Sequence, residues 1–78
     1  MYYQRLRDLR EDSDLTQEQV ANFLGMKQPQ YARYESGLQE IPLHHFIKLG
    51  IFYNVSLDYL AGLIPSVEKL DRFTKKRS

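Results

Sequence analysis

The sequence predicts an all-α domain of five short helices, followed by a basic C-terminal extension. Apolar residues recur at helical spacing along most of the chain, and no segment shows the sustained alternation of apolar and polar residues that is typical of a strand. Glycine, proline and helix-capping residues fall between the helical segments. Because 78 residues suffice for only one small domain, we expect that domain to span residues 1–65 and the extension to span residues 66–78.

The first predicted helix covers residues 2–12. Leu6 and Leu9 lie three residues apart and therefore share one face, while charged residues occupy much of the remaining surface. We expect the face with the two leucines to be buried. Ser13 and Asp14 then form a turn.

The second predicted helix opens at Thr16 and ends at Gly25. Thr16 and Gln19 have the spacing of a capping box, in which each side chain serves a backbone amide of the first turn. Leu15 precedes this cap and can pack back onto the helix. Gly25 is suited to the helix end because glycine adopts a positive φ without strain. The buried stripe of this helix is expected to contain Val20, Ala21 and Leu24.

The third predicted helix covers residues 28–35. Pro29 lies in its first turn, where a proline costs no intrahelical hydrogen bond. Tyr31 and Tyr34 lie three residues apart and are expected to face the core. Gly37 closes the segment.

The fourth predicted helix covers residues 42–53, with Pro42 as its first residue and Asn54 as its end. A short fifth helix follows, capped by Ser56 and ended by Gly62. The residues of these two helices that are available to the core are Leu43, Phe46, Ile47, Leu49, Gly50, Tyr53, Leu57, Leu60 and Ala61.

The second and third helices are joined by only three residues, Gly25, Met26 and Lys27. Gly25 permits the sharp turn that such a short link needs. Ala21 lies midway along the first of the pair, where a larger side chain would hold the second helix away. This spacing is what a helix-turn-helix needs, and we place that motif at residues 17–36.

Four sequence segments in the right order indicate that the motif belongs to a larger family pattern. From residue 6 to residue 62 the chain resembles the lambda-repressor/Cro-type helix-turn-helix family, also called the XRE family. The matching phrases are LRDLRED, LTQEQVANFLGM, YARYESG and NVSLDYLAG. The resemblance implies a lambda-repressor-like domain that regulates transcription, most often as a repressor, by placing the third helix in the major groove of double-stranded DNA. It also implies a homodimer on a pseudo-palindromic operator.

The outward face of the third helix carries side chains suited to reading DNA. With the two tyrosines buried, Pro29, Ala32 and Arg33 point away from the core, and Gln28 lies at the exposed tip. Gln and Arg can each make bidentate hydrogen bonds to base edges. By the resemblance, base contacts are expected from Gln28, Pro29 and Arg33, with Lys27 and Gln30 nearby for bases or phosphates. Each also has a plainer interpretation, as a solvated polar residue, a helix-starting proline or an arginine paired with Glu35 or Glu40.

Phosphate contacts are expected from other parts of the chain. Gln17 begins the second helix and matches a phosphate-contacting position of the family, where the helix dipole favours an anion. The net charge of +1 is unevenly distributed along the chain. Residues 1–65 contain six basic and eight acidic residues and are slightly acidic, whereas the extension contains five basic and two acidic residues. The extension is either a solvated chain end or an arm that contacts phosphates through Lys75, Lys76 and Arg77.

The family resemblance also implies a structural ion pair, and the sequence differs from the family pattern at two places. Positions matching Arg10 and Glu35 form a partly buried ion pair in this family, which needs no role in DNA binding. Lys27 stands where the family usually has a small hydroxyl residue, so the cap of the third helix is weaker or comes from elsewhere. The following loop, residues 38–40, lacks the basic residues often found there.

A possible dimer interface lies toward the end of the chain. Ile51 stands where the family usually has a polar residue. With three neighbours it is expected to form an apolar patch shared between subunits, the alternative being scattered surface residues or packing within the chain. The candidate interface residues are Ile51, Phe52, Leu63 and Ile64.

Other classes of function are disfavoured. The absence of cysteine excludes a disulfide framework and the usual structural zinc sites, and His44 and His45 are neighbours that point about 100° apart on a helix. The sequence has no glycine-rich phosphate loop or nucleophile elbow, so we expect no enzyme activity. We also expect no metal and no cofactor, and, because no sensor domain is recognised, no small-molecule effector. Apolar runs are too short for a membrane helix, so we expect a cytoplasmic protein on bacterial or phage DNA. The alternative function is a protein-interaction module, such as an antitoxin-like or antirepressor partner.

Overall fold

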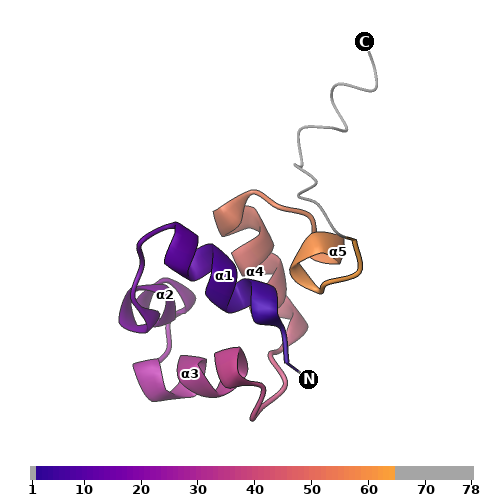
Figure 1. The fold of residues 1–78 in the computed structure, drawn as a ribbon. Coiled ribbons are helices and arrows are strands. Elements are labelled where there is room, and N and C mark those ends of the chain that lie inside the picture. Colours follow the sequence, from indigo (N-terminus) through magenta and orange to yellow (C-terminus); the bar gives the residue numbers. More distant parts are fainter. Residues whose placement is uncertain (1, 65–78) are drawn as a thin grey trace.

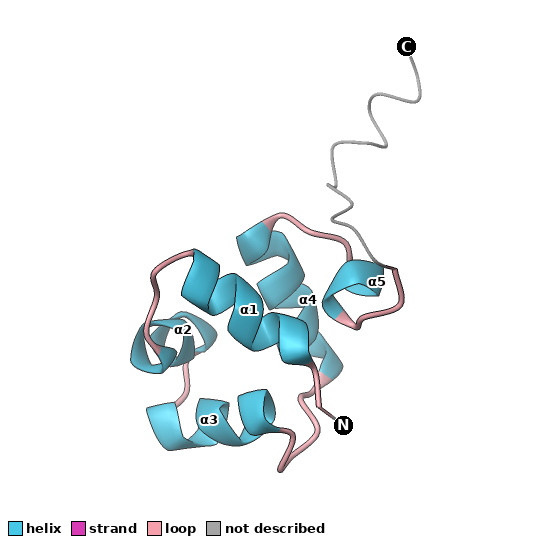
Figure 2. Ribbon diagram, viewed as in Figure 1, coloured by secondary structure: helices cyan, strands magenta, loops and turns pink. Residues whose placement is uncertain are grey.

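The computed structural model describes residues 2–64 and contains five helices (Figure 1). These are α1 (Gln4–Asp12), α2 (Gln17–Leu24), α3 (Gln28–Ser36), α4 (Leu43–Tyr53) and α5 (Leu57–Leu60). Residues 2–64 contain no strand (Figure 2), as the sequence predicts. None of the described helices is long and apolar enough to cross a membrane.

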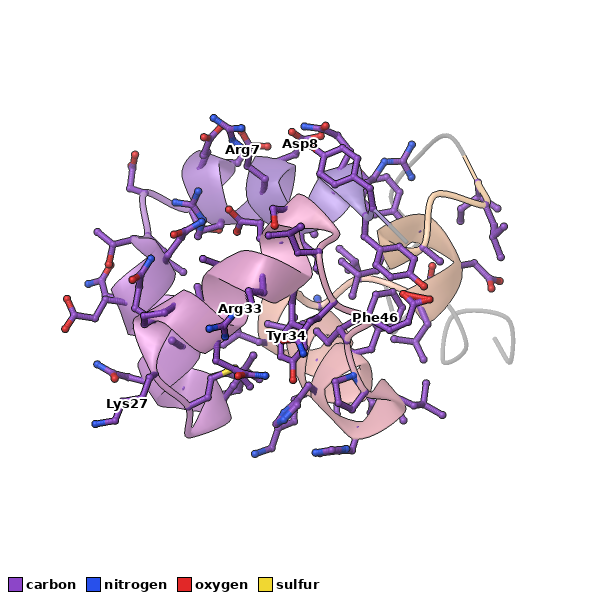
Figure 3. The ribbon with its side chains drawn as sticks, turned by 90° about the horizontal axis from the view of Figure 1, so that it is seen from below. Arg7, Asp8, Lys27, Arg33, Tyr34 and Phe46 are labelled. Carbon is purple, nitrogen blue, oxygen red and sulfur yellow. The ribbon has the colours of Figure 1, made fainter. Side chains whose placement is uncertain are left out.

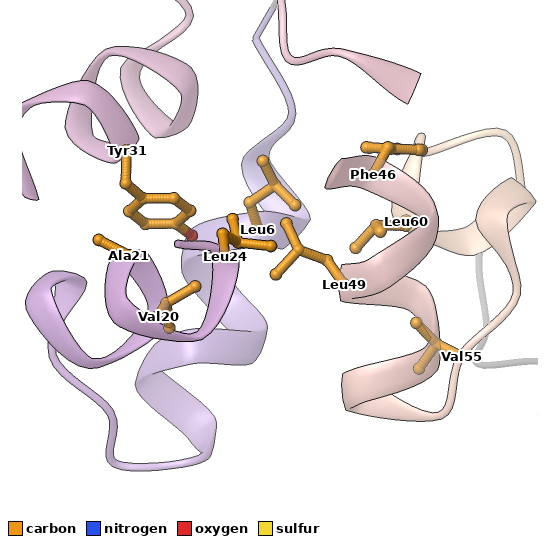
Figure 4. Close-up of a cluster of buried hydrophobic side chains, with 9 residues drawn as sticks. All are labelled: Leu6, Val20, Ala21, Leu24, Tyr31, Phe46, Leu49, Val55 and Leu60. Atoms are coloured by element: carbon orange, nitrogen blue, oxygen red, sulfur yellow. The ribbon is translucent and has the colours of Figure 1, made fainter. Parts of the chain in front are cut away.

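The helices pack around one core. α2 and α3 lie against each other as a consecutive pair, and α5 packs on both α4 and α1. α1 also contacts α3, so it bridges the helix pair and the C-terminal half of the domain (Figure 1). All five helices contribute to the core, and the close-up in Figure 4 shows Leu6 and Leu49 lying between the α2–α3 pair and α5. The buried cluster comprises Leu6, Val20, Ala21, Leu24, Tyr31, Phe46, Leu49, Val55 and Leu60.

The predicted caps of α2 are confirmed. The Thr16 hydroxyl accepts a hydrogen bond from the amide of Gln19 at 3.1 Å, and Gln19 Oε1 accepts one from the amide of Thr16 at 2.8 Å. Gly25 follows the helix with a φ of 77°, in the left-handed region. Because both ends of α2 are specified locally, the start and length of the helix pair follow from its own residues.

The predicted starts of α1 and α4 were each placed too early. α1 begins at Gln4 rather than at residue 2, and Pro42 is the N-cap of α4 rather than its first helical residue. Two residues expected in the core are exposed: Leu43, which is 67% exposed in the first turn of α4, and Ile47. Phe46, Leu49 and Gly50 form the buried stripe of α4, and Ile47 lies about 100° around the helix from Phe46.

Gly50 allows α5 to approach α4 closely. A Cβ atom at this position would lie 2.8 Å from Leu57 Cδ2 and 3.3 Å from the carbonyl oxygen of Val55. Leu57 is itself partly exposed, so it packs on Gly50 at the edge of the core rather than inside it as expected. The small residue therefore sets the distance between the last two helices.

Candidate nucleic-acid interface

One face of α3 is buried and the opposite face is open. Tyr31 and Tyr34 are buried, as predicted, and Tyr31 packs beside Ala21 of α2 (Figure 4). On the open side, Figure 3 looks onto α3 and shows Lys27 and Arg33 at the surface. The exposed residues here are Lys27, Gln28, Pro29 and Arg33, whereas Ala32 is half-buried.

The start of α3 has no side-chain cap. Lys27 is the N-cap residue, and its side chain accepts no hydrogen bond from the first turn. Pro29 removes one amide that would otherwise need a partner. The amides of Gln30 and Tyr31 donate to the Lys27 carbonyl, and the positive end of the helix dipole favours an anion, such as a DNA phosphate, beside this helix start.

Gln28 is braced by α2. Its Nε2 donates to Gln17 Oε1 at 2.7 Å, and Gln17 Nε2 donates in turn to Glu35 Oε1 at 2.9 Å. Gln17, the candidate phosphate contact, is half-buried and lies between the two. The structure therefore brings together two candidate DNA-contacting residues that are 11 positions apart.

Glu35 is held by Arg10. The Arg10 Nε–Glu35 Oε2 distance is 2.8 Å and the Nη2–Oε1 distance is 3.0 Å, and Arg10 Nη1 also donates to the carbonyl of Leu15 at 2.9 Å. Glu35 is only 3% exposed. Burial alone would raise the pKa of Glu35, but the hydrogen bonds from Arg10 and Gln17 outweigh it and hold the pKa below its usual value. The pair joins α1, the start of α2 and the end of α3.

Two tyrosines lie close to this carboxylate. Burial raises the pKa of Tyr53 to about 12 and also raises that of Tyr31, and the charge of Glu35 adds to both effects. The Tyr53 hydroxyl has no hydrogen-bond partner among the described residues, whereas the Tyr31 hydroxyl also interacts directly with the Glu35 carboxylate, which further raises the pKa of Tyr31. Both phenols therefore remain neutral at ordinary pH, and Arg10 is the cation that balances Glu35.

The side chains of the remaining candidate base contacts, Arg33 and Gln30, differ in how available they are to DNA. Arg33 Nη1 donates to Gln30 Oε1 at 3.3 Å, a weak contact that DNA can replace. Because Glu35 is engaged by Arg10 and Gln17, the considered pairing of Arg33 with Glu35 is not the arrangement found. Gln30 is half-buried and donates to the Tyr34 hydroxyl at 2.8 Å, so it is less available than its neighbours.

α4 adds a residue to this face that the sequence did not clearly assign. His45 lines an open hollow of about 480 Å³ together with Lys27, Pro29 and Arg33. Burial lowers the pKa of His45, as do the nearby charges of His44 and Lys48, which keeps this imidazole neutral near pH 7. The described residues contain no group of three or more side chains able to hold a metal ion.

The candidate dimer residues fall into two groups. Ile51, Phe52 and Leu63 are exposed, whereas Ile64 is half-buried. Phe52 stacks on Phe23 of α2, with ring centroids 4.5 Å apart, so the apolar surface at the end of α4 includes a residue that the sequence pattern did not indicate.

Ile64 is held by another residue without a sequence signal, Arg5. Arg5 Nη1 donates to the carbonyls of Tyr59 and Ile64 at 2.8 and 2.7 Å, and its guanidinium lies 4.1 Å from the centre of the Tyr59 ring. These contacts tie the end of α5 to α1. The tail residues proposed for phosphate contact, Lys75, Lys76 and Arg77, lie outside the described residues.

Comparisons with known proteins agree with this geometry. A helix-turn-helix family model matches residues 6–60. The chain is 40% identical over 82 residues to the uncharacterized HTH-type transcriptional regulator YobD of Bacillus subtilis, covering 97% of this chain and 73% of that protein. It is 42% identical over 62 residues to the cryptic phage CTXphi transcriptional repressor RstR of Vibrio cholerae, covering 80% and 56%. No solved structure gives a significant match.

Proposed function

This chain belongs to the helix-turn-helix family of DNA-binding transcriptional regulators, of the lambda-repressor/Cro or XRE type, and on that premise we propose that it is a homodimeric repressor. The observation that carries the proposal is the open face of α3, where Gln28 is braced by Gln17 and Arg33 is exposed. The similarity to a phage repressor supports repression over activation. Such a regulator would act in the bacterial cytoplasm, where bacterial or phage DNA lies. We propose no catalytic role.

Each exposed residue of α3 has a contact that fits its chemistry. Gln28 and Arg33 suit bidentate contacts to adenine and guanine, respectively, in the major groove. Pro29 has no donor and can only make an apolar contact, for example with a thymine methyl group. Lys27 reaches a base or a phosphate. Gln30 would first have to leave Tyr34, so we propose for it a secondary contact.

Binding to the phosphate backbone then fixes the position of α3 in the groove. Gln17 lies at the start of α2, beside Gln28, and is proposed to contact a phosphate with an amide of the same helix end. The described residues carry few cations on this face, so we expect modest non-specific affinity. Specific binding should depend on base contacts and on pairing of two subunits.

We propose that two copies associate through the apolar surface at the end of α4. Ile51 and Phe52 are exposed there, and Phe23 extends the surface onto α2. Leu63 contributes from beyond α5, and Ile64 contributes less because it is half-buried. A pair related by a two-fold axis would present two α3 helices to a pseudo-palindromic operator.

Selection of bound DNA from a random double-stranded pool tests this function. We expect an enriched motif with two inverted half-sites whose centres lie about one helical turn, or a multiple of it, apart. A single enriched half-site would contradict the dimer. No enrichment, together with a protein that co-purifies without DNA, would favour the alternative of a protein-interaction module.

Removal of the basic tail should weaken binding without changing specificity. Deleting residues 69–78 removes five cations, and for every phosphate that the tail no longer neutralises, the slope of log affinity against log salt should become shallower by about 0.9. The motif selected from the pool should stay the same. Affinities for operator and random DNA, measured at several salt concentrations, check this result.

A variant of full length is the control for the tail deletion. Replacing Lys75, Lys76 and Arg77 by Gln keeps the chain length and removes three of the five charges. We expect an intermediate salt slope. An unchanged slope in both variants would show that the tail does not contact phosphates.

A further inference from the structure

Four of the five helices in residues 2–64 end in the same kind of turn. After α1, α2, α4 and α5, a residue in the left-handed region is followed by one whose amide donates to the carbonyl five positions earlier, at 2.8–3.0 Å. The left-handed residues are Asp14, Gly25, Asn54 and Gly62. The residues that close the turns are Leu15, Met26, Val55 and Leu63. This is the Schellman motif, in which the closing residue often makes an apolar contact with its own helix.

The closing residue of the last turn is placed differently from the other three. Val55 belongs to the hydrophobic core, and Leu15 and Met26 pack against that core. Leu63 is instead 75% exposed. The turn after α5 is therefore closed by its backbone, but its apolar side chain contributes little to the chain's own interior.

The sequence of α5 explains this exposure. The helix residue that pairs with the closing residue in a Schellman motif is here Asp58, which is charged and exposed and so offers no apolar partner. The preceding residue, Leu57, packs on Gly50 of α4 instead. Leu63 is thus left without an apolar partner on its own helix.

Arg5 supports this turn from α1. Its Nη1 donates to the carbonyls of Tyr59 and Ile64, so a single guanidinium nitrogen connects the two sides of the turn. The guanidinium also lies over the Tyr59 ring. Since α5 has only four residues, it gives the turn little support of its own. These contacts of Arg5, which we call the clamp, take the place of the missing apolar contact.

We propose that Leu63 is an anchor for the second subunit and that Arg5 is the positioning residue that presents it. The inference rests on the proposed function, because it specifies how one part of the surface proposed for subunit pairing is built. A leucine exposed in a closed turn gains free energy when another copy covers it. Under a two-fold axis each copy contributes one such leucine to a self-complementary contact.

A second copy of the chain is the partner that fits this surface. Residues 1–65 contain six basic and eight acidic residues, so two copies repel each other only weakly. The clamp also keeps Leu63 in one position before the subunits meet, which avoids an ordering cost on binding. The alternative occupant is a later part of the same chain, which would cover Leu63 without any effect on pairing.

Two single variants and their combination test the proposal in the full-length chain. Leu63→Ala shortens the anchor, and Arg5→Met removes the clamp but keeps an unbranched apolar side chain. Leu43→Ala is a matched control, because Leu43 is also largely exposed but lies outside the surface proposed for pairing. Arg7→Met is the control for charge on the same helix. Sedimentation equilibrium measures the dissociation constant of the dimer for each variant.

We expect Leu63→Ala and Arg5→Met each to raise the dissociation constant by about tenfold, since two anchors per dimer are shortened or misplaced. The double variant should match Leu63→Ala within about a factor of two, because a clamp without an anchor has nothing to present. The two control variants should leave the constant unchanged. Multiplication of the two single effects would overturn the positioning role of Arg5, and an unchanged constant for Leu63→Ala would overturn the anchor.

Arg5→Lys keeps the test valid even when Arg5→Met does not fold. Lysine retains the positive charge but lacks the planar guanidinium that lies over the Tyr59 ring. We expect a smaller increase of the dissociation constant, and no increase when Leu63→Ala is already present. The same increase with and without Leu63→Ala would contradict positioning through Leu63.

Hydrogen exchange followed by NMR tests the clamp without subunit pairing. In a solution dilute enough for the chain to be monomeric, the Leu63 amide should exchange about tenfold faster in Arg5→Met, because the turn opens more often. The Val55 amide closes the corresponding turn after α4, with a hydrogen bond of 3.0 Å, and its rate should not change. An unchanged rate at Leu63 would overturn the clamp whatever the pairing results are.

These measurements separate the inference from the proposed function. A wild-type chain that pairs through Leu63 but selects no DNA would contradict the proposed function alone. A wild-type chain that stays monomeric at every concentration would overturn both the homodimer and the anchor. A lower melting temperature of Leu63→Ala with unchanged pairing would show that a later part of the same chain covers Leu63, and would overturn the proposal.

Discussion

Replacement of Arg10 by Met should destabilise this protein far more than the same replacement at Arg7. Arg10 is the partner of a carboxylate that is 3% exposed, and its removal leaves that charge buried without a cation. Breaking a buried pair in this way typically costs about 3–5 kcal/mol. For a domain of this size, the melting temperature should fall by more than about 10 °C.

Arg7 is the matched control on the same helix. It also pairs with a glutamate, Glu11, at 2.9 Å, but both side chains are more than half exposed. Water and salt screen such a pair, so Arg7→Met should hardly change the melting temperature. Thermal unfolding followed by circular dichroism measures both variants. Equal melting temperatures would contradict a structural role for the buried pair.

The same pair predicts a loss of stability in acid. Because the pKa of Glu35 is lower in the folded protein than its usual value of 4.5, the ionised carboxylate stabilises the fold. This contribution is fully present above pH 4.5 and is lost as the pH falls through the lower folded pKa. Wild-type melting temperatures should therefore drop below pH 4.5, and more steeply than those of Glu35→Gln.

Replacement of Arg33 by Met should weaken operator binding by about ten- to a hundredfold, the value of one good bidentate base contact. Arg33 is exposed on the open face of α3, and its side chain donates to Gln30 through a weak 3.3 Å contact, so its removal should leave the melting temperature unchanged. Discrimination should relax at one base of each half-site. Binding assays on the selected operator and on single-base variants measure this effect.

Arg7→Met again supplies the control for charge. It removes one positive charge from α1, away from the open face of α3 (Figure 3), so any reduction in affinity should be small and equal for all sequences. If Arg33→Met behaves in the same way, Arg33 contacts a phosphate or nothing at all, and the assignment of a base contact is wrong.

The parts of the fold that could be predicted depend on short-range signals. The capping box of Thr16 and Gln19, and the left-handed Gly25, each act within three or four residues, so the sequence displays them completely. The buried tyrosines of α3 follow from helical periodicity in the same way. The type and spacing of Leu43 predict a core position, but Leu43 is largely exposed in the first turn of α4.

The apolar surface at the end of α4 and the contacts of Arg5 can be recognised only in the packed structure. Phe23 is an ordinary helical residue in the sequence, and only the packing of α2 near the end of α4 brings it against Phe52. Arg5 shows no signal at all, since its two carbonyl partners lie 54 and 59 residues away. Periodicity predicts which residues face inward but not which surface residues of different helices meet.

Residue order and spacing are enough to predict an all-α domain with a helix-turn-helix, its family, and a third helix with Gln28 and Arg33 on its open face. These depend on periodicity, caps and spacing, which are properties of neighbouring residues. The hydrogen bonds from Gln28 to Gln17, from Gln17 to Glu35 and from Arg10 to Glu35 could be seen only in the folded protein, because they span 11, 18 and 25 residues. Hydrogen-bond partners at such separations are set by how the helices pack.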